Sequence, residues 1–236
     1  MKITFAGIGG MAAIITLIFF AGLWILETRK RTGADLRTGQ ILNGIGFGML
    51  PGIAVWKIFE SEIPPGRGTE LFDPIGAIPW ITEDGRFAVS RIEMILAAVC
   101  FLGIILWLIA RKEDLPGNGD LLLTVLCIWG LIRGFTEGLR AESFFRAGNI
   151  SISQIGVLAA ADVAMAVWTV RLDEAQKSTA FAILEWIAVL SCEAVTVLNT
   201  ADILSAGSAV GDLAVNAGCA ALCMALMLMT GRDSRN

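Results

Sequence analysis

Three charged residues in the segment from Trp129 to Arg140 have the spacing of one helix face. Arg133, Glu137 and Arg140 stand at positions i, i+4 and i+7, and residues three or four apart lie one above another on an α-helix. Arg133 is about thirteen residues, roughly 20 Å at the helical rise, from the inner end of its expected membrane-crossing helix. An ionised arginine at this depth costs at least about 2.5 kcal/mol. It therefore needs a partner or a water-filled cavity.

A guanidinium group matches phosphate, because its planar fork donates two parallel hydrogen bonds to two oxygens. Arg133 and Arg140 are therefore suited to hold the phosphodiester of a phospholipid near the outer headgroups. Glu137 lies one helical turn from Arg133 and would fix the orientation of its fork. The alternative is a structural Arg133–Glu137 ion pair, with an Arg140 side chain that extends to the membrane surface.

The last three apolar segments contain further polar residues that would lie within or near the membrane. Glu185 and Glu193 are two helical turns apart and roughly on one face. Membrane carboxylates often relay protons or cations, so an ion-coupled transporter is one interpretation. The other is that these residues hydrogen-bond neighbouring helices together. The set comprises Asp162, Glu185, Glu193, Asn199, Asp202, Asp212 and Asn216.

The cysteines do not indicate a metal site. None of the five has CxxC spacing and the chain has no histidine, so we expect small apolar side chains packed in the membrane. We expect no metal and no cofactor. Because tyrosine is also absent, any proton transfer must use a carboxylate, a lysine, a cysteine or water. The five are Cys100, Cys127, Cys192, Cys219 and Cys223.

Long uncharged blocks predict an all-α membrane protein. The chain is 56% hydrophobic, and Ile3–Leu26 contains 24 residues without a charge. About 20 apolar residues span a bilayer as a helix, which satisfies its own backbone hydrogen bonds. We therefore predict a single domain, residues 1–236, that forms a bundle of about seven transmembrane helices. Their expected ranges are 4–27, 39–59, 91–110, 120–141, 151–171, 178–200 and 208–230.

Basic residues predict how the bundle is oriented. Ten of the eighteen Lys and Arg residues fall on one side if the amino terminus is outside, and cytoplasmic loops carry the excess of positive charge. We predict an outer amino terminus, a cytoplasmic carboxyl terminus and an extracytoplasmic loop at 60–90. The second helix contains several glycines and Pro51. It is expected either to pack closely through small residues or to break and line a cavity.

The segment GLIRGFTEGLR resembles the GxxRFxxExxR motif of prolipoprotein diacylglyceryl transferases. Gly130, Arg133, Glu137 and Arg140 match, while Gly134 stands where that family has an aromatic residue. Other pieces follow in the family's order, so that the resemblance covers roughly residues 1–59 and 90–171. They are Ile3–Gly7, Gly44–Trp56, Arg91-Ile92-Glu93, Gly119-Asp120 and Ser153-Gln154.

The chain also departs from that family. It lacks the GRxGNxxNxExxG signature and the active-site histidine, and residues 60–90 stand where the family has the helix pair that carries the signature. Two further helices, within residues 172–236, follow the transferase-like part at 1–171. The family route to catalysis therefore lacks several of its usual residues, and no general base is identified.

The resemblance implies an enzyme of the bacterial plasma (inner) membrane. It would transfer the diacylglyceryl group of phosphatidylglycerol to the lipobox cysteine of a prolipoprotein signal peptide. Arg133 and Glu137 are the catalytic candidates, and Arg140, Gly130 and Glu93 are the substrate-binding candidates. The alternatives are an inactive relative that binds phospholipid or signal-peptide helices, and the small ion-coupled transporter. No segment has the basic, aromatic-interleaved pattern of a nucleic-acid partner.

Overall fold

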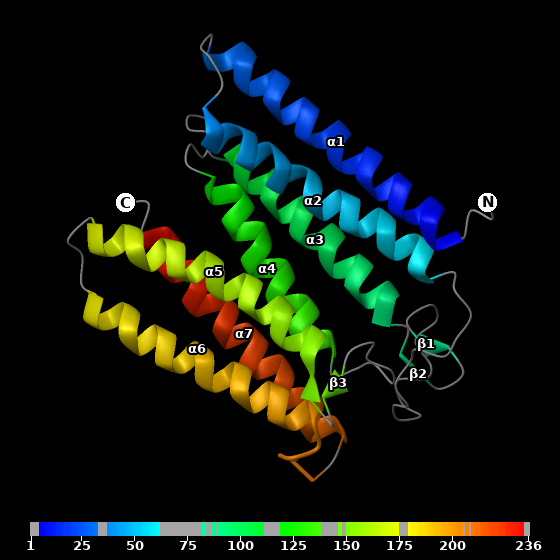
Figure 1. The fold of residues 1–236 in the computed structure, drawn as a ribbon, viewed down its shortest axis with the longest axis vertical. Helices are drawn as coiled ribbons and strands as arrows, with labels where there is room; N and C mark the ends of the chain where they lie inside the picture. Colours follow the sequence, from blue (N-terminus) through cyan, green and yellow to red (C-terminus); the bar gives the residue numbers. More distant parts are fainter. Residues whose placement is uncertain are drawn as a thin grey trace. The chain divides into compact units, whose positions relative to one another are not determined.

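The computed structural model consists almost entirely of α-helices (Figure 1). The helices are α1 (Phe5–Thr32), α2 (Thr38–Ser61), α3 (Val89–Ala110), α4 (Asp120–Thr136), α5 (Ile152–Glu174), α6 (Thr179–Thr200) and α7 (Ala209–Asp233). The strands are β1 (Thr82–Glu83), β2 (Arg86–Phe87), β3 (Arg146–Ala147) and β4 (Ile150–Ser151). The structure describes residues 5–32, 37–61, 82–83, 86–87, 89–110, 119–137, 146–147, 150–174, 179–204, 206–207 and 209–233.

Six of these helices are long and apolar enough to cross a membrane: α1, α2, α3, α5, α6 and α7. Large aliphatic side chains are exposed along them, including Ile15, Leu106 and Leu184. Exposed apolar area on this scale fits a lipid environment. The all-α class and the multi-pass membrane character predicted from sequence are thus confirmed. The count of seven spans stays a prediction, because α4 has only 17 described residues. The predicted orientation also stays a prediction.

The fourth helix is shorter than expected. It ends at Thr136 instead of 141, so Arg133 lies in its last turn and Glu137 directly follows it. Gly134 and Gly138 flank this end, and glycine has a low helix propensity. Arg140 lies outside the described residues, so the expectation that one helix carries all three charged residues stays a prediction.

The chain divides into two compact units, with the boundary inside α4. Unit 1 comprises Met1–Pro65, Ala77–Asp84 and Ala88–Val125. Unit 2 comprises Gly66–Gly76, Gly85–Phe87 and Leu126–Asn236. This division describes packing only. The prediction of a single domain, and the division into a transferase-like part at 1–171 and two further helices at 172–236, stay predictions.

In unit 1, α2 packs between α1 and α3. Gly44, Gly48 and Gly52 form one face of α2, four residues apart, where a Cβ atom would meet the backbone of α1. This favours close packing of α2 through small residues over a broken helix that lines a cavity. The helix runs unbroken through Pro51, and its glycines allow close contact. Asn43 of the same helix accepts a hydrogen bond from Leu121 N at 2.8 Å and so caps the start of α4.

A substitution at Gly48 tests this close packing. A Cβ atom there would lie 2.3 Å from the carbonyl oxygen of Leu17, so the helices must separate. Gly48→Ala is expected to lower the free energy of unfolding by about 1–3 kcal/mol, as overpacking does, measured by thermal unfolding in detergent. Gly103→Ala is the matched control, since no atom lies within 4 Å of its Cβ position. Equal stability of the two variants would contradict the close contact.

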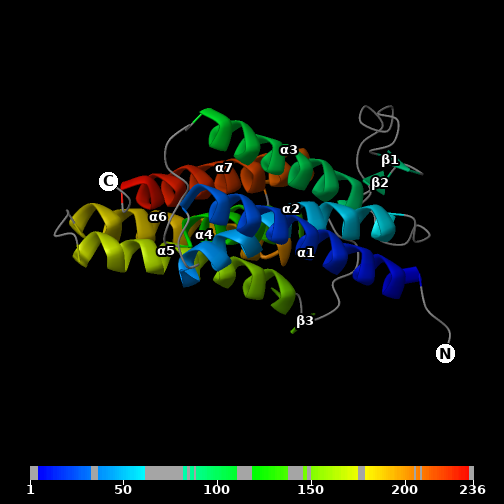
Figure 2. The same cartoon turned by 90° about the horizontal axis from the view of Figure 1, so that it is seen from above.

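In unit 2, α5, α6 and α7 pack against one another, as the view from above in Figure 2 also shows. Trp168, Met165, Val189 and Met227 are fully buried among them. The short strands β3 and β4 pair antiparallel, with Arg146 opposite Ser151. This hairpin leads directly into the start of α5, where the polar residues of the unit gather.

Candidate functional site

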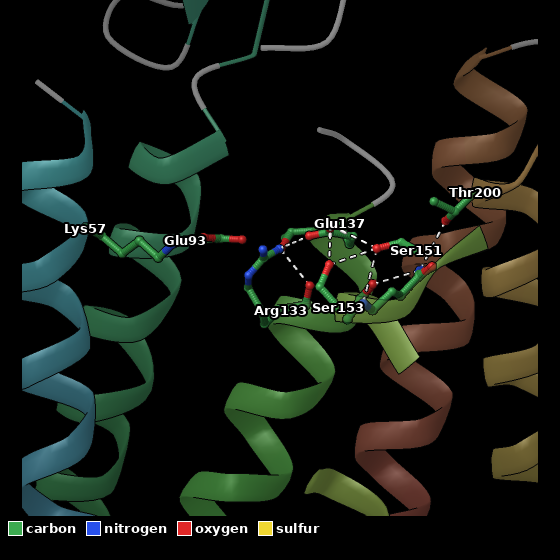
Figure 3. Close-up of polar contacts among 10 residues, drawn as sticks. Lys57, Glu93, Arg133, Glu137, Ser151, Ser153 and Thr200 are labelled. Atoms are coloured by element: carbon green, nitrogen blue, oxygen red, sulfur yellow. Dashed lines mark hydrogen bonds and ion pairs between the residues drawn. The ribbon is translucent and has the colours of Figure 1, made fainter. Parts of the chain in front are cut away.

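The first polar site of unit 2 is the ion pair of Arg133 with Glu137 (Figure 3). The two residues are four apart, so the predicted contact across one turn is present. The Glu137 side chain is 1% exposed, whereas that of Arg133 is 20% exposed. The Glu137 side chain is thus almost fully enclosed, whereas the Arg133 side chain is partly accessible.

Two serines hold the carboxylate of Glu137. Ser151 donates a hydrogen bond to Glu137 Oε1 at 3.1 Å, and Ser153 donates one to the same oxygen at 2.8 Å. The other oxygen, Oε2, accepts from Arg133. Hydrogen bonds to a charged carboxylate stabilise its ionised form and restrict its position. Glu137 is therefore occupied as an anchor for Arg133 and is poorly placed to take a proton from a substrate.

Gln154 connects three helices next to this pair. It is fully buried, and its Nε2 donates to Gly134 O at 2.9 Å and to Thr200 Oγ1 at 3.1 Å. Its backbone N–H donates to Ser151 Oγ at 3.3 Å, so Ser151 also caps the amino terminus of α5. These bonds place the ends of α4 and α6 beside the start of α5 within unit 2.

Gln154→Ala should weaken unit 2 without touching Arg133. The change removes two donated hydrogen bonds and leaves Gly134 O and Thr200 Oγ1 without that donor. We expect the free energy of unfolding to fall by about 1–3 kcal/mol, measured by unfolding in detergent. Ser191→Ala serves as control, because its exposed hydroxyl donates to the carbonyl oxygen of Ile187 in the same helix. A similar loss in both variants would argue against the role of Gln154.

Gly130 and Gly134 bring α4 close to α5. A Cβ atom at Gly130 would lie 2.7 Å from Val157 O, and one at Gly134 would lie 2.4 Å from Leu158 Cδ2. Gly130, a substrate-binding candidate, therefore faces a neighbouring helix. An aromatic side chain at position 134, as in the family motif, would need a different arrangement of Leu158.

Unit 1 contains a second buried ion pair. Lys57 Nζ of α2 lies 2.6 Å from Glu93 Oε2 of α3, and the two side chains are 7% and 0% exposed. Glu93 was a candidate from its place in the resemblance, whereas its pairing with Lys57 was not predicted. The pair is thus suited to joining α2 and α3.

The acidic residues of the last helices have separate surroundings. Thr230 of α7 donates a hydrogen bond to Glu185 Oε2. Asn199 Nδ2 donates to Asn216 Oδ1 at 3.0 Å and to Asp212 O at 3.1 Å, so it joins α6 to α7. These contacts fit polar residues that hold helices together. Glu193 differs, because its side chain interacts with the carboxyl group of Asp162 on α5.

The five cysteines are free thiols, and Cys127 and Cys223 are buried. Cys127 Sγ lies 3.5 Å from Met227 Sδ, and Cys223 Sγ lies 3.7 Å from Val189 O. Among the described residues, no group of three or more Cys, Asp or Glu is arranged to hold a metal ion. Both buried thiols thus contact groups of neighbouring helices in unit 2.

Sequence spacing identified Arg133 and Glu137 but missed most of their surroundings. Ser151 and Thr200 were not singled out, because each contacts the site from a distant part of the chain. The pattern Ser-x-x-Gln at 151–154 is a helix-start signal and could have marked Ser151 as a cap. No protein-family model, curated protein or solved structure matches this chain. The site is therefore interpreted from its own geometry.

Proposed function

We propose that this protein binds the phosphate of a membrane phospholipid through Arg133 and transfers the lipid's diacylglyceryl group to a lipobox cysteine. The observation that carries the proposal is the partial exposure of the Arg133 side chain, while Glu137 anchors it from the buried side. A guanidinium that is oriented before the lipid arrives can bind phosphate with less loss of conformational entropy.

The proposed transfer uses the charge of Arg133 on the leaving group. The cysteine sulfur forms a bond to the glycerol carbon of phosphatidylglycerol, and the bond from that carbon to the phosphate oxygen breaks. Glycerol phosphate leaves with the electron pair, and the thiol proton ends on its phosphate. A fixed cation stabilises the negative charge that develops on the phosphate. Glu137 is a positioning residue in this proposal, and Glu93, which pairs with Lys57 in unit 1, is assigned no step.

The direct test is transfer by the purified full-length chain. The protein is placed in phosphatidylglycerol vesicles with a synthetic lipobox peptide, and mass spectrometry follows the peptide. We expect the peptide to gain a diacylglyceryl group while glycerol phosphate appears in equal amount. Phosphatidylcholine vesicles are the control for the headgroup. Complementation of a transferase-depleted bacterium gives the same test in cells.

Each other outcome has a clear meaning. Co-purification of phosphatidylglycerol without transfer would contradict the enzyme and support an inactive, lipid-binding relative. Failure of both binding and transfer by folded protein would contradict the phosphate role of Arg133 as well. The predicted localisation in a bacterial plasma membrane belongs to the same proposal, and it is tested by fractionating cells that express the chain.

A further inference from the structure

Two carboxyl groups face each other inside the membrane-crossing part of unit 2. Asp162 lies on α5 and Glu193 on α6, with their side chains in hydrogen-bonding range. Glu193 is 7% exposed. Asp162 Oδ1 and Glu193 Oε1 are both buried and have no hydrogen-bond partner among the described residues. This arrangement is unlike that of Glu137 and Glu185, whose oxygens accept hydrogen bonds.

The pair lies well below the ends of its helices. Gln154 bonds Thr200, so the start of α5 and the end of α6 lie at the same end of the unit. At the helical rise, Asp162 is about 15 Å from the start of α5 and Glu193 about 10 Å from the end of α6. Both depths fall within an apolar layer about 30 Å thick.

No basic side chain of the described part of unit 2 reaches this depth on the helices concerned. Arg171 is about 13 Å further along α5 than Asp162, and Arg232 is in the last turn of α7. The titratable groups beside Glu193 from the packed helices are thiols. They are Cys127 of α4, Cys192 of α6 and Cys223 of α7. Among the described residues of unit 2, we therefore expect the two carboxyl groups to offset part of each other's cost of burial.

Two ionised carboxylates in contact repel each other strongly where little water is present. A single proton held between them removes one charge and supplies the donor that the contact needs. Ca²⁺ and Mg²⁺ prefer about six or more oxygen ligands, whereas the two carboxyl groups together supply four oxygen atoms. We propose that Asp162 and Glu193 form a proton-binding site, which holds one exchangeable proton between their carboxyl oxygens. This site goes beyond the lipid chemistry proposed for Arg133.

Infrared spectroscopy of the full-length chain in phosphatidylglycerol vesicles tests the proposal. A protonated carboxyl gives a carbonyl band separate from that of carboxylate, and the band shifts in heavy water when its proton exchanges. We expect this band at neutral pH, and we expect the double variant Asp162→Asn/Glu193→Gln to lose it. Glu185→Gln is the matched control on α6. It should leave the band of the Asp162–Glu193 pair unchanged. Circular dichroism checks that each variant is folded.

Labelling with dicyclohexylcarbodiimide gives a second readout, because this apolar reagent attacks protonated carboxyls from the lipid phase. Modification is expected at Asp162 or Glu193 and should decrease as the pH rises. A wild-type spectrum without the protonated band would overturn the proposal even if a variant failed to fold. Protection from the reagent by sodium ions at constant pH would also overturn it, since the ligand would then be a metal cation. Neither outcome depends on whether lipid transfer occurs.

Discussion

Lys57→Met is expected to lower the free energy of unfolding of unit 1 by about 3–5 kcal/mol, because it removes one partner of a buried ion pair. The two side chains are 7% and 0% exposed, and their charged atoms lie 2.6 Å apart. Glu93→Gln should cost a similar amount, since it leaves the ammonium without this carboxylate. Unfolding in detergent, followed by tryptophan fluorescence, measures both.

The double variant Lys57→Met/Glu93→Leu should recover most of that loss. Replacing both members of a buried pair by apolar residues of similar volume is often neutral or stabilising. The exposed pair of Arg31 with Glu27, also in unit 1, is the control, with side chains 57% and 52% exposed. Arg31→Gln should produce no measurable change. If the double variant were as unstable as the single ones, burial of an uncompensated charge would not be the cause.

Arg133→Gln is expected to reduce diacylglyceryl transfer by about 10²–10³-fold, the usual cost of removing one group that stabilises developing negative charge. Arg133→Lys should recover only part of this loss, because it retains the charge but not the planar fork. The peptide assay in phosphatidylglycerol vesicles measures the rates. Transfer by Arg133→Gln at the wild-type rate would contradict the role of Arg133.

Glu137 provides the accompanying test of positioning. Glu137→Gln keeps an amide oxygen that can accept hydrogen bonds from Ser151 and Ser153, but it removes the charge that orients Arg133. We expect a smaller loss of transfer than in Arg133→Gln, with a rise in KM for the lipid and little change in unfolding temperature. A purely structural role would instead lower the stability and leave the KM of the folded fraction unchanged.

The helices were predictable because a bilayer permits few alternatives. Long uncharged blocks that must satisfy their own hydrogen bonds become helices, and six of the seven expected ones are long and apolar enough to span. The predicted helix ran past Thr136, because Arg133, Glu137 and Arg140 have the spacing of one helix face. The low helix propensity of Gly134 and Gly138 is the sequence signal for the earlier end. The close contact of α2 with α1 was one of two expectations, and the structure shows it at Gly44, Gly48 and Gly52.

Sequence alone determined the membrane-spanning helical class and the pairing of Arg133 with Glu137, because both depend on neighbours within one segment. Only the tertiary structure decided the other partners: Ser151 and Ser153 for Glu137, Lys57 for Glu93, and Asp162 for Glu193. Each of these contacts joins different elements of the chain. Helical periodicity determines which residues share a face, whereas the choice of partner depends on which faces the packed helices turn toward each other.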